Sequence, residues 1–556
     1  MMFTANWKKI TDWRVLFTIT GIVAALFMFV NLSGLSLRNW DEGIHAEVSR
    51  EVIEMHDWVT MHFMGGEYFR KPPLKFVLSA AVMTVTGPTE WAVRAPNAAA
   101  GVLVTLLILL WIWQVTRERW AIPTLGVLFL STTTYFMHTF RSGETDGVLT
   151  LFIIGAIYAY WRAKTSPRWL YWSAAAIGLS IMTKSAAGLV PLIVMAIDTT
   201  VTHSWKTFGW KRLLWSVGIV TAIVAPWHII ELMRFGRVFW NDYFFLHIIE
   251  RGEEAIVNPT AGPFWYFKIV WTRLYPTLLF TLPALLVLLR SLIRDRVRDV
   301  RFLWAIWFVI GFIVVTTAKS KLDWYLFPYY FPLLLLTTQV VIDWLKRTER
   351  DWLRTLAVLA VAIGAFTTLP ERVPKLSSVR YLLPQFWLKL VGVREMNPLT
   401  VAVGTVIAAA LVLWVVRRFV PAMRVNERSE RLALAVLVVY LSFSFMWINA
   451  VRIVREKAPL GYNESMAFIE SRPDTTKTIL LYSTSIWSNP AGYFYWHRNN
   501  AGVIRDAKFD PANLELLSRN PGTYVLMNIK TPIPAFTDRP LRLLNKENEI
   551  LVLDRP

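Results

Sequence analysis

Residues 92–115 read AVRAPNAAAGVLVTLLILLWIWQV, an apolar run that carries a single charged side chain, Arg94. A helix needs about 20 predominantly apolar residues to cross a bilayer, and this run is long enough. Similar runs recur as far as residue 450, which predicts an all-helical polytopic membrane domain. We expect about 13 spans, near residues 13–36, 92–115, 120–140, 147–163, 169–184, 186–201, 213–234, 273–290, 302–318, 325–345, 355–370, 399–416 and 432–450.

The composition agrees with a membrane protein. Of the 556 residues, 55% are apolar and only 18% are charged, whereas soluble domains carry about 25% charged residues. These values exclude disordered, collagen-like and disulfide-rich secreted chains, and they disfavour an ordinary cytosolic enzyme. The chain has no Cys, which excludes a thiolate nucleophile and fits an oxidising compartment such as a bacterial periplasm. We attribute the net charge of +20 to basic loops and expect no nucleic-acid partner.

The distribution of Lys and Arg assigns the loops to sides of the membrane. The N-terminus and six short turns rich in Lys and Arg form one consistent side, which the positive-inside rule places in the cytoplasm. The basic turns are 117–119, 162–168, 206–212, 290–301, 346–354 and 417–431. The first apolar run is too long for a signal peptide and lacks a small-residue cleavage site. We therefore expect a multi-pass protein of the bacterial inner membrane.

Two short stretches need separate interpretation. Residues 184–188 separate two apolar runs and predict a tight hairpin between helices. Residues 74–87 are apolar, but these 14 residues are few for a span. We interpret them as an interfacial or re-entrant helix, because a span here would reverse the side of every later loop. A genuine span remains the alternative.

The chain divides into residues 1–450, the membrane domain, and residues 451–556, which are more polar. The apolar runs at 478–482, 524–527 and 550–553 predict buried strands. Residues 459–471 and 513–518 predict helices, so we expect a small periplasmic α/β domain.

The first external loop, 38–75, is the most informative region for function. Asp41 and Glu42 stand next to each other at its start, where Asp41 could also serve as a helix cap. Residues 42–55 have apolar side chains at helical spacing, which predicts an amphipathic helix on the membrane surface. Arg70 and Lys71 precede Pro72-Pro73 at the end of the loop, and such cations suit an anionic head group.

Other external loops add acids and bases, in the stretches 141–146 (RSGETD), 240–251 and 319–325 (KSKLDWY). The spans themselves carry few charges, whereas a proton- or ion-driven transporter would bury ionisable groups within them. The pattern favours an enzyme that acts at the outer membrane surface over a lipid or solute transporter.

These motifs resemble those of the GT-C membrane glycosyltransferases that use polyprenyl-phosphate sugars, which include the protein O-mannosyltransferases. They are most similar to the undecaprenyl-phosphate 4-amino-4-deoxy-L-arabinose (lipid A) transferase family. The similarity rests on Asp41-Glu42-x-x-x-Ala46-Glu47-x-x-Arg50-Glu51, Asp57-Trp58-Val59, Tyr68-Phe69-x-Lys71-Pro72-Pro73, His247 with Arg251, and Lys321-Leu322-x-x-Tyr325-x-x-Pro328. The family commonly has Arg-Tyr where Ile44-His45 stand, and Glu where Arg70 stands.

The resemblance implies a donor sugar on undecaprenyl phosphate, a lipid A acceptor and a protein that acts as a monomer. We expect a catalytic set of Asp41, Glu42 and Asp146, with Asp146 facing the sugar amine. The cations stabilise charge on the departing phosphate. We expect the lipid phosphate to be bound by Lys71, Arg70, Arg251, Tyr325, Lys319 and Lys321.

Lipid A phosphate is largely ionised at neutral pH and needs no general base, whereas a protein hydroxyl would need Asp41 as one. We expect a single displacement with inversion, because no covalent nucleophile stands out. A divalent metal on His45 and His247, with Asp41 and Glu42, is the alternative, but no metal-binding spacing supports it. We therefore expect no required cofactor. Transfer of another polyprenyl-linked sugar to protein or envelope glycan is the nearest alternative function. We also expect the prenyl tail to lie in a groove between the 74–87 helix and the spans.

Overall fold

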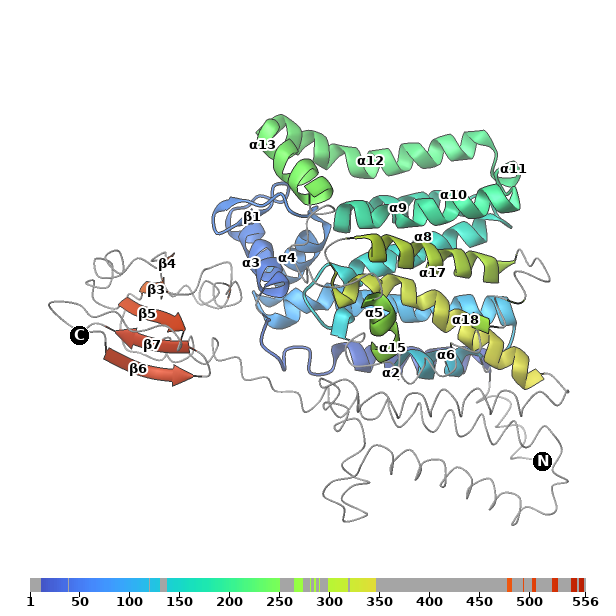
Figure 1. Ribbon diagram of the computed structural model, residues 1–556, viewed down its shortest axis with the longest axis horizontal. Coiled ribbons are helices and arrows are strands. Elements are labelled where there is room, and N and C mark those ends of the chain that lie inside the picture. Colours follow the sequence, from blue (N-terminus) through green and yellow to red (C-terminus); the bar gives the residue numbers. More distant parts are fainter. Residues whose placement is uncertain are drawn as a thin grey trace, which may run out of the picture.

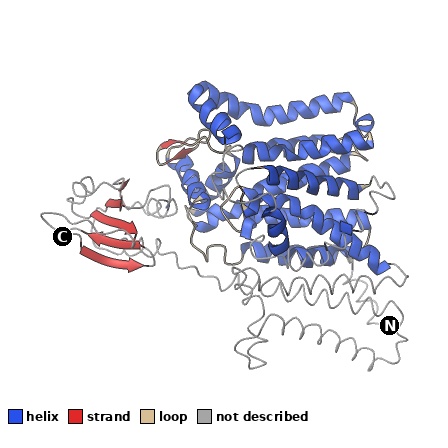
Figure 2. Cartoon of the chain, in the orientation of Figure 1, coloured by secondary structure: helices blue, strands red, loops and turns tan. Residues whose placement is uncertain are grey.

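The computed structural model of the chain describes residues 12–38, 40–119, 121–130, 138–250, 265–273, 299–318 and 321–346, five C-terminal strands and a few isolated positions. Most of these residues are helical, and Figure 1 shows the helices side by side in one bundle. The larger sheet lies beyond the end of the bundle that carries α3, Asp41–Glu54. Figure 2 separates the strands from the helices by colour.

The helices of the bundle come from the described parts of the chain between residues 13 and 346. Besides α3 they are α2 (Trp13–Phe29), α4 (Leu74–Thr86), α5 (Glu90–Thr116), α6 (Ala121–Leu130), α8 (Asp146–Ala163), α9 (Trp169–Lys184), η1 (Ser185–Leu189), α10 (Val190–Thr202), α11 (Trp205–Phe208), α12 (Trp210–Phe235), α13 (Arg237–Phe239), η2 (Trp240–Glu250), α15 (Trp265–Arg273), α17 (Val300–Thr317), η3 (Asp323–Leu326) and α18 (Phe327–Lys346).

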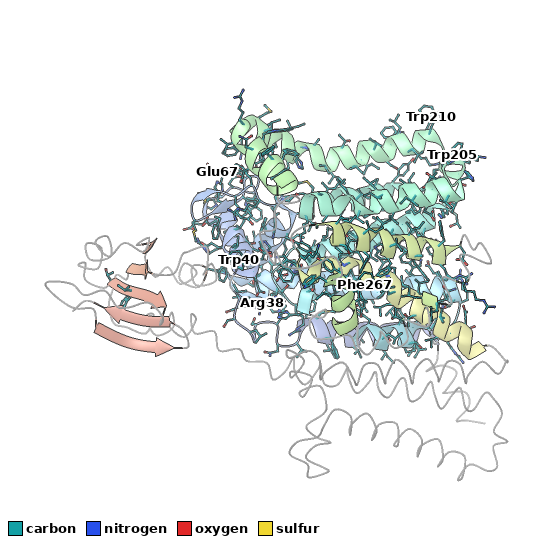
Figure 3. All side chains as sticks on the ribbon, viewed as in Figure 1. Arg38, Trp40, Glu67, Trp205, Trp210 and Phe267 are labelled. Carbon is teal, nitrogen blue, oxygen red and sulfur yellow. The ribbon has the colours of Figure 1, made fainter. Side chains whose placement is uncertain are left out.

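Five apolar stretches within the described residues are long enough to cross a membrane. They are Glu90–Thr116, Trp169–Thr202, Trp210–Phe235, Val300–Thr317 and Trp324–Asp343. Each overlaps a predicted span, so a multi-pass membrane protein is confirmed. Figure 3 shows Trp205 and Trp210 at the bundle end opposite to Arg38, Trp40 and Glu67. Exposed Trp side chains at both ends are typical of the two membrane–water interfaces.

The first predicted span, 13–36, is too long. Helix α2 ends at Phe29, and Val30 already has extended backbone angles. The guanidinium of Arg141 donates to the carbonyl oxygens of Phe27 and Met28 at 2.7 and 2.9 Å, and to that of Val30 at 2.8 Å. These bonds satisfy carbonyl groups that have no partner inside the helix. The sequence gives no local signal for this end, because Arg141 lies more than 110 residues away.

The predicted hairpin at 184–188 is confirmed. Lys184, at the end of α9, pairs with Asp146 at the start of α8, whereas Asp198 in α10 accepts from Tyr160 near the end of α8. The chain therefore reverses at η1. Gly188 is required there, because a Cβ atom would lie 2.4 Å from the backbone nitrogen of Ile181.

Residues 74–87 contain the predicted short helix. Helix α4 has 13 residues and a length of about 20 Å, which is less than the hydrocarbon thickness of about 30 Å. It packs against α3 and α5, and the Lys75 ammonium is buried, donating to the Ser79 hydroxyl and the Val93 carbonyl. Its interfacial or re-entrant placement stays a prediction.

Aromatic rings fill the core between α5 and α17. Trp111 is fully buried, and its ring centroid lies 5.7 Å from that of Trp304 and 6.3 Å from that of Trp307. Large rings bury much apolar surface and fix the relative position of the helices.

The three predicted C-terminal strands are all present. They are β3 (Thr478–Tyr482), β5 (Thr523–Asn528) and β7 (Ile550–Asp554), joined by β4 (Val503–Asp506) and β6 (Arg542–Glu547). The sheet order is β4-β3-β5-β7-β6, in which β3 pairs in parallel with β4 and β5, and β7 pairs antiparallel with β5 and β6.

Several predictions lie outside the described residues. They are the spans at 355–370, 399–416 and 432–450, most of 273–290, and the helices at 459–471 and 513–518. The α/β domain and its boundary at residue 451 therefore stay predictions.

Candidate functional site

Helix α3 confirms the predicted helix in the first external loop but not its surface location. Its polar side chains Glu42, His45 and Glu47 are buried, as are Ile44 and Val48 on other faces. The apolar spacing alone predicts that one face of the helix is exposed to solvent. Instead α4, α5 and the β1–β2 hairpin (His62–Phe63 and Gly66–Glu67) pack around it. Trp40 precedes the helix with φ 77° and makes no side-chain cap, so Asp41 is the first helical residue and not the cap.

Glu42 lies in a closed network. Its carboxylate accepts from the Arg94 guanidinium at 2.8 Å, from the Gly143 N–H at 2.8 Å and from the Arg38 N–H at 2.9 Å. Burial alone would raise the pKa of Glu42, but Arg94 and Arg38 hold that pKa well below its usual range. Both carboxylate oxygens of Glu42 therefore accept hydrogen bonds from within the protein, and its catalytic role stays a prediction.

Arg94 and Gly143 complete this scaffold. The Arg94 guanidinium also donates to the carbonyl oxygens of Leu32 and Leu35 at 2.8 and 2.6 Å, which ties α5 to the chain that leads into α3. A Cβ atom at position 143 would lie 2.4 Å from Val93 Cγ1. Glycine is therefore needed for the loop 141–145 to approach α3 this closely.

Asp41 and Lys71 face each other across the loop. Lys71 Nζ lies 3.4 Å from Asp41 Oδ2 and 2.9 Å from His45 Nε2. The Lys71 side chain is 10% exposed and that of Asp41 is 24% exposed, so the pair lies at the edge of the buried region. The structure thus brings together the acid and the base that the sequence motifs single out.

A second ion pair forms at the ends of α8 and α9. Lys184 Nζ contacts both oxygens of Asp146, at 2.7 and 2.9 Å, and lies 4.6 Å from the ring centroid of Tyr325. Sequence reasoning predicted Asp146 and Tyr325 but missed Lys184 as a site residue. Its position at the end of an apolar run was the available signal.

Glu144 feels the charges of both carboxylates of the two ion pairs, and the sequence did not single it out. Burial, against the lowering effect of Arg38 and with the charges of Asp146, Asp41 and Glu42, raises the pKa of Glu144 to about 7. Glu144 Oε1 accepts from Arg38 Nη2 at 3.2 Å. The charges of Asp41 and Asp146 therefore both act on Glu144, which places the two ion pairs at the same end of the bundle.

Lys321 does not have the expected phosphate-binding geometry. It is 5% exposed, and its ammonium donates to the carbonyl oxygens of Thr316 and Ala318 at 2.8 and 2.6 Å. It therefore caps the end of α17. Arg70 is exposed beside Lys71. Arg251 and Lys319, and the side chain of His247, lie outside the described residues.

The residues that the structure describes include no group of three or more His, Asp or Glu side chains that could hold a metal ion. His45 uses both ring nitrogens in other contacts, since Nδ1 lies 3.2 Å from the Gly143 carbonyl oxygen and Nε2 faces Lys71. A metal could bind His45 Nε2 only by displacing Lys71, which disagrees with the metal-ligand alternative for this residue.

Comparisons with known proteins agree with this architecture. Residues 70–230 match the family described as dolichyl-phosphate-mannose-protein mannosyltransferase. The undecaprenyl phosphate-alpha-4-amino-4-deoxy-L-arabinose arabinosyl transferase of Aeromonas salmonicida is 28% identical over 87% of this chain and 83% of its own length. A second enzyme of that name, from Proteus mirabilis, is 28% identical over 66% of this chain and 68% of its own.

A solved structure has the same fold. The crystal structure of ArnT from Cupriavidus metallidurans bound to undecaprenyl phosphate aligns over 98% of both chains with a TM-score of 0.68 and 20% sequence identity. The apo form of that protein aligns equally well.

The helical bundle, its charged site and these similarities therefore define a polytopic membrane glycosyltransferase. More narrowly, the chain is similar to the undecaprenyl phosphate-4-amino-4-deoxy-L-arabinose arabinosyl transferases over most of its length, and to the protein mannosyltransferase family over residues 70–230.

Proposed function

We propose that this protein transfers 4-amino-4-deoxy-L-arabinose from undecaprenyl phosphate to a phosphate of lipid A at the periplasmic face of the inner membrane. The observation that carries the proposal is the Asp41–Lys71 pair, at 3.4 Å, in a chain whose relatives have this activity in their names. The proposal includes a cytoplasmic N-terminus, a periplasmic site and action as a monomer.

In the proposed reaction, an oxygen of the acceptor phosphate attacks the anomeric carbon of the donor. The bond between that carbon and the oxygen of undecaprenyl phosphate breaks, and the electron pair leaves with the lipid phosphate. The Lys71 ammonium stabilises this charge more in the transition state than in the ground state. Attack from the opposite face inverts the anomeric centre.

Asp41 has a role that does not require proton transfer. A phosphate monoester is largely ionised at neutral pH, because its second pKa is about 6. We propose that Asp41 orients Lys71 and the sugar, to which it is available because its side chain is partly exposed. Asp146 is paired with Lys184, so we propose that this ion pair shapes the site. We propose that the amine of the sugar contacts the carboxyl groups of Asp41 and Glu144.

Mass spectrometry of lipid A tests the proposal. Cells that make the aminoarabinose donor but lack an endogenous transferase would express the intact protein or its Asp41→Asn variant. We expect an added aminoarabinose mass with the intact protein. We expect the variant to lose about 100-fold or more of the transfer rate, because the charge that orients the reacting groups is removed.

Asp57→Asn is the matched control in the same loop. Asp57 accepts from the N–H groups of Val59 and Thr60 through Oδ1, which an Asn oxygen can replace, and the substitution loses only a surface ion pair of Oδ2 with Arg234 at 3.2 Å. This variant should keep the transfer activity. An unmodified lipid A in cells with the protein present in the membrane would contradict the proposal and favour another undecaprenyl-linked sugar or another acceptor. That no cofactor is required stays a prediction, which addition of a chelator to the purified enzyme tests.

A further inference from the structure

His45 is a fully buried imidazole that connects three parts of the site. It lies on α3 one turn after Asp41, with Nδ1 3.2 Å from the Gly143 carbonyl oxygen and Nε2 2.9 Å from Lys71 Nζ. Its ring also makes an edge contact with Phe76 of α4, with centroids 5.2 Å apart. One side chain therefore joins the loop 141–145, the Lys71 segment and α4.

These contacts define which nitrogen carries the proton. A carbonyl oxygen only accepts hydrogen bonds, so the bond to Gly143 requires a proton on Nδ1. An ammonium group only donates, so the bond to Lys71 requires a lone pair on Nε2. Both conditions are met by one tautomer of neutral imidazole. Burial lowers the pKa of His45 well below its usual value, and the charge of Lys71 lowers it further, in agreement with a neutral ring.

Gly143 bonds to both His45 and Glu42, and so fixes the imidazole relative to the buried Glu42–Arg94 ion pair. Its N–H donates to Glu42 Oε1 at 2.8 Å while its carbonyl oxygen accepts from His45. Glu42 is in turn fixed by Arg94. The direction of His45 Nε2 is therefore set by a buried network and not by contact with a substrate.

We infer that His45 is a positioning residue for Lys71, which it holds in the direction needed to bind the phosphate of the polyprenyl donor. Asp41 and His45 approach the Lys71 ammonium from two positions on α3, one turn apart, and so fix its orientation. A neutral acceptor can orient the ammonium without cancelling the positive charge that the phosphate needs, whereas a second carboxylate would cancel it. The inference rests on the proposed role of Lys71 in phosphate binding.

An imidazole suits this double contact better than a phenol would. A phenol hydroxyl can both donate and accept through a single oxygen, whereas the imidazole separates these functions onto two atoms. The separation lets His45 hold Gly143 and Lys71 at the same time.

Two amide variants separate the two contacts. The amide of Gln reaches the position of Nε2, so His45→Gln keeps an acceptor for Lys71. The amide of Asn reaches the position of Nδ1, so His45→Asn keeps the Gly143 contact and loses the Lys71 contact. The matched control is Ser49→Ala, on the same helix, which removes only a hydroxyl bonded to the His45 carbonyl oxygen.

The experiment titrates the purified full-length protein in detergent with undecaprenyl phosphate and follows tryptophan fluorescence. We expect His45→Asn to weaken the affinity by roughly tenfold, the loss expected for a hydrogen bond to a charged group. His45→Gln and Ser49→Ala should stay within about twofold of the unaltered protein. Thermal unfolding of each variant identifies any that fails to fold, and the Gln variant alone still tests the inference.

A double-mutant cycle distinguishes positioning from a structural role. If His45 acts through Lys71, His45→Asn should cause no further loss of affinity in a Lys71→Ala background. An equal loss in both backgrounds would overturn the inference, as would weak binding by His45→Gln with unchanged thermal stability. Because undecaprenyl phosphate carries no sugar, failure of the lipid A assay would refute the proposed function and leave this binding test intact.

Discussion

At the scale of single residues, the site is a set of charges whose roles depend on burial. Asp41 and Glu42 are neighbours in sequence, yet the Asp41 side chain is 24% exposed and the Glu42 side chain is fully buried. Removing one partner of a buried ion pair leaves an uncompensated charge. Glu42 is therefore expected to maintain the fold, while Asp41 is available to a substrate.

Glu144 predicts a dependence of stability on pH. Its carboxyl has a pKa of about 7 in the folded protein and an ordinary value of 4.5. Between these values the folded state binds more protons than the unfolded state, so its contribution to stability falls as the pH rises. A Glu144→Gln variant does not ionise, and its amide oxygen can still accept from Arg38.

We therefore expect Glu144→Gln to gain stability relative to the unaltered protein as the pH rises from 5 to 8. The gain should be on the order of 2–3 kcal/mol. Thermal unfolding of both proteins across this range measures it. A difference that does not change with pH, or that changes in favour of the unaltered protein, would contradict the assignment.

The same residues show what sequence reasoning could and could not predict. Asp41 and Lys71 lie in one loop, so their motifs place them together. The partner of Glu42 is 52 residues away and that of Asp146 is 38 residues away, so neither pairing follows from a local pattern. The contacts of Lys321 with the carbonyl groups that end α17 likewise do not follow from its motif.

At the scale of elements, apolar periodicity predicted most helices but not their ends or their surroundings. The spans at α5, α12 and α17 lie close to the predicted ranges. A long apolar run in a bilayer forms a helix, because a helix satisfies all its backbone hydrogen bonds internally. Helix α3 was predicted as a helix but not as a buried one, because α4, α5 and the β1–β2 hairpin pack around it from parts of the chain that its own spacing does not reveal.

The α9–α10 hairpin gives a prediction at this scale. A Cβ atom on Gly188 would meet the backbone of Ser180 and Ile181 at 2.4 Å, and backbone atoms cannot move aside as a flexible side chain can. Gly188→Ala should destabilise the protein by about 1–3 kcal/mol, seen as a lower Tm. Because Lys184 lies next to the hairpin, transfer activity should fall as well.

Gly218 in α12 provides the control for this substitution. No atom lies within 4 Å of a Cβ placed there. Gly218→Ala should leave Tm unchanged or raise it, because Ala is the better helix former by up to about 1 kcal/mol. Equal changes in Tm for Gly188→Ala and Gly218→Ala would show that the close backbone contact in the hairpin does not require glycine at position 188.

At the scale of the whole molecule, one aromatic side chain connects the C-terminal part to the site helices. Phe494 is fully buried among Leu37, Ala46, Met83 and Val93, residues of α3, α4, α5 and the preceding loop. Ala46 is adjacent to His45 in α3, so Phe494 packs on the helix that carries Asp41 and His45.

We expect Phe494→Ala to loosen the C-terminal part from the helical bundle, since truncating a buried Phe costs about 3–5 kcal/mol. Limited proteolysis should release C-terminal fragments faster from this variant. Phe267→Ala is the control, because Phe267 is 58% exposed. Identical cleavage rates for Phe494→Ala and the unaltered protein would contradict the contact.

The bond network of Arg141 has a consequence for biosynthesis. The guanidinium satisfies the last carbonyl groups of α2, yet it follows them by 110 to 114 residues. A ribosome adds about 5–20 residues per second, so the first helix is made roughly 5–20 seconds before its terminal partner exists. During that interval water or lipid head groups must solvate this end of α2. Helix α2 is therefore synthesised early but completed late, when the loop before α8 reaches its C-terminal end.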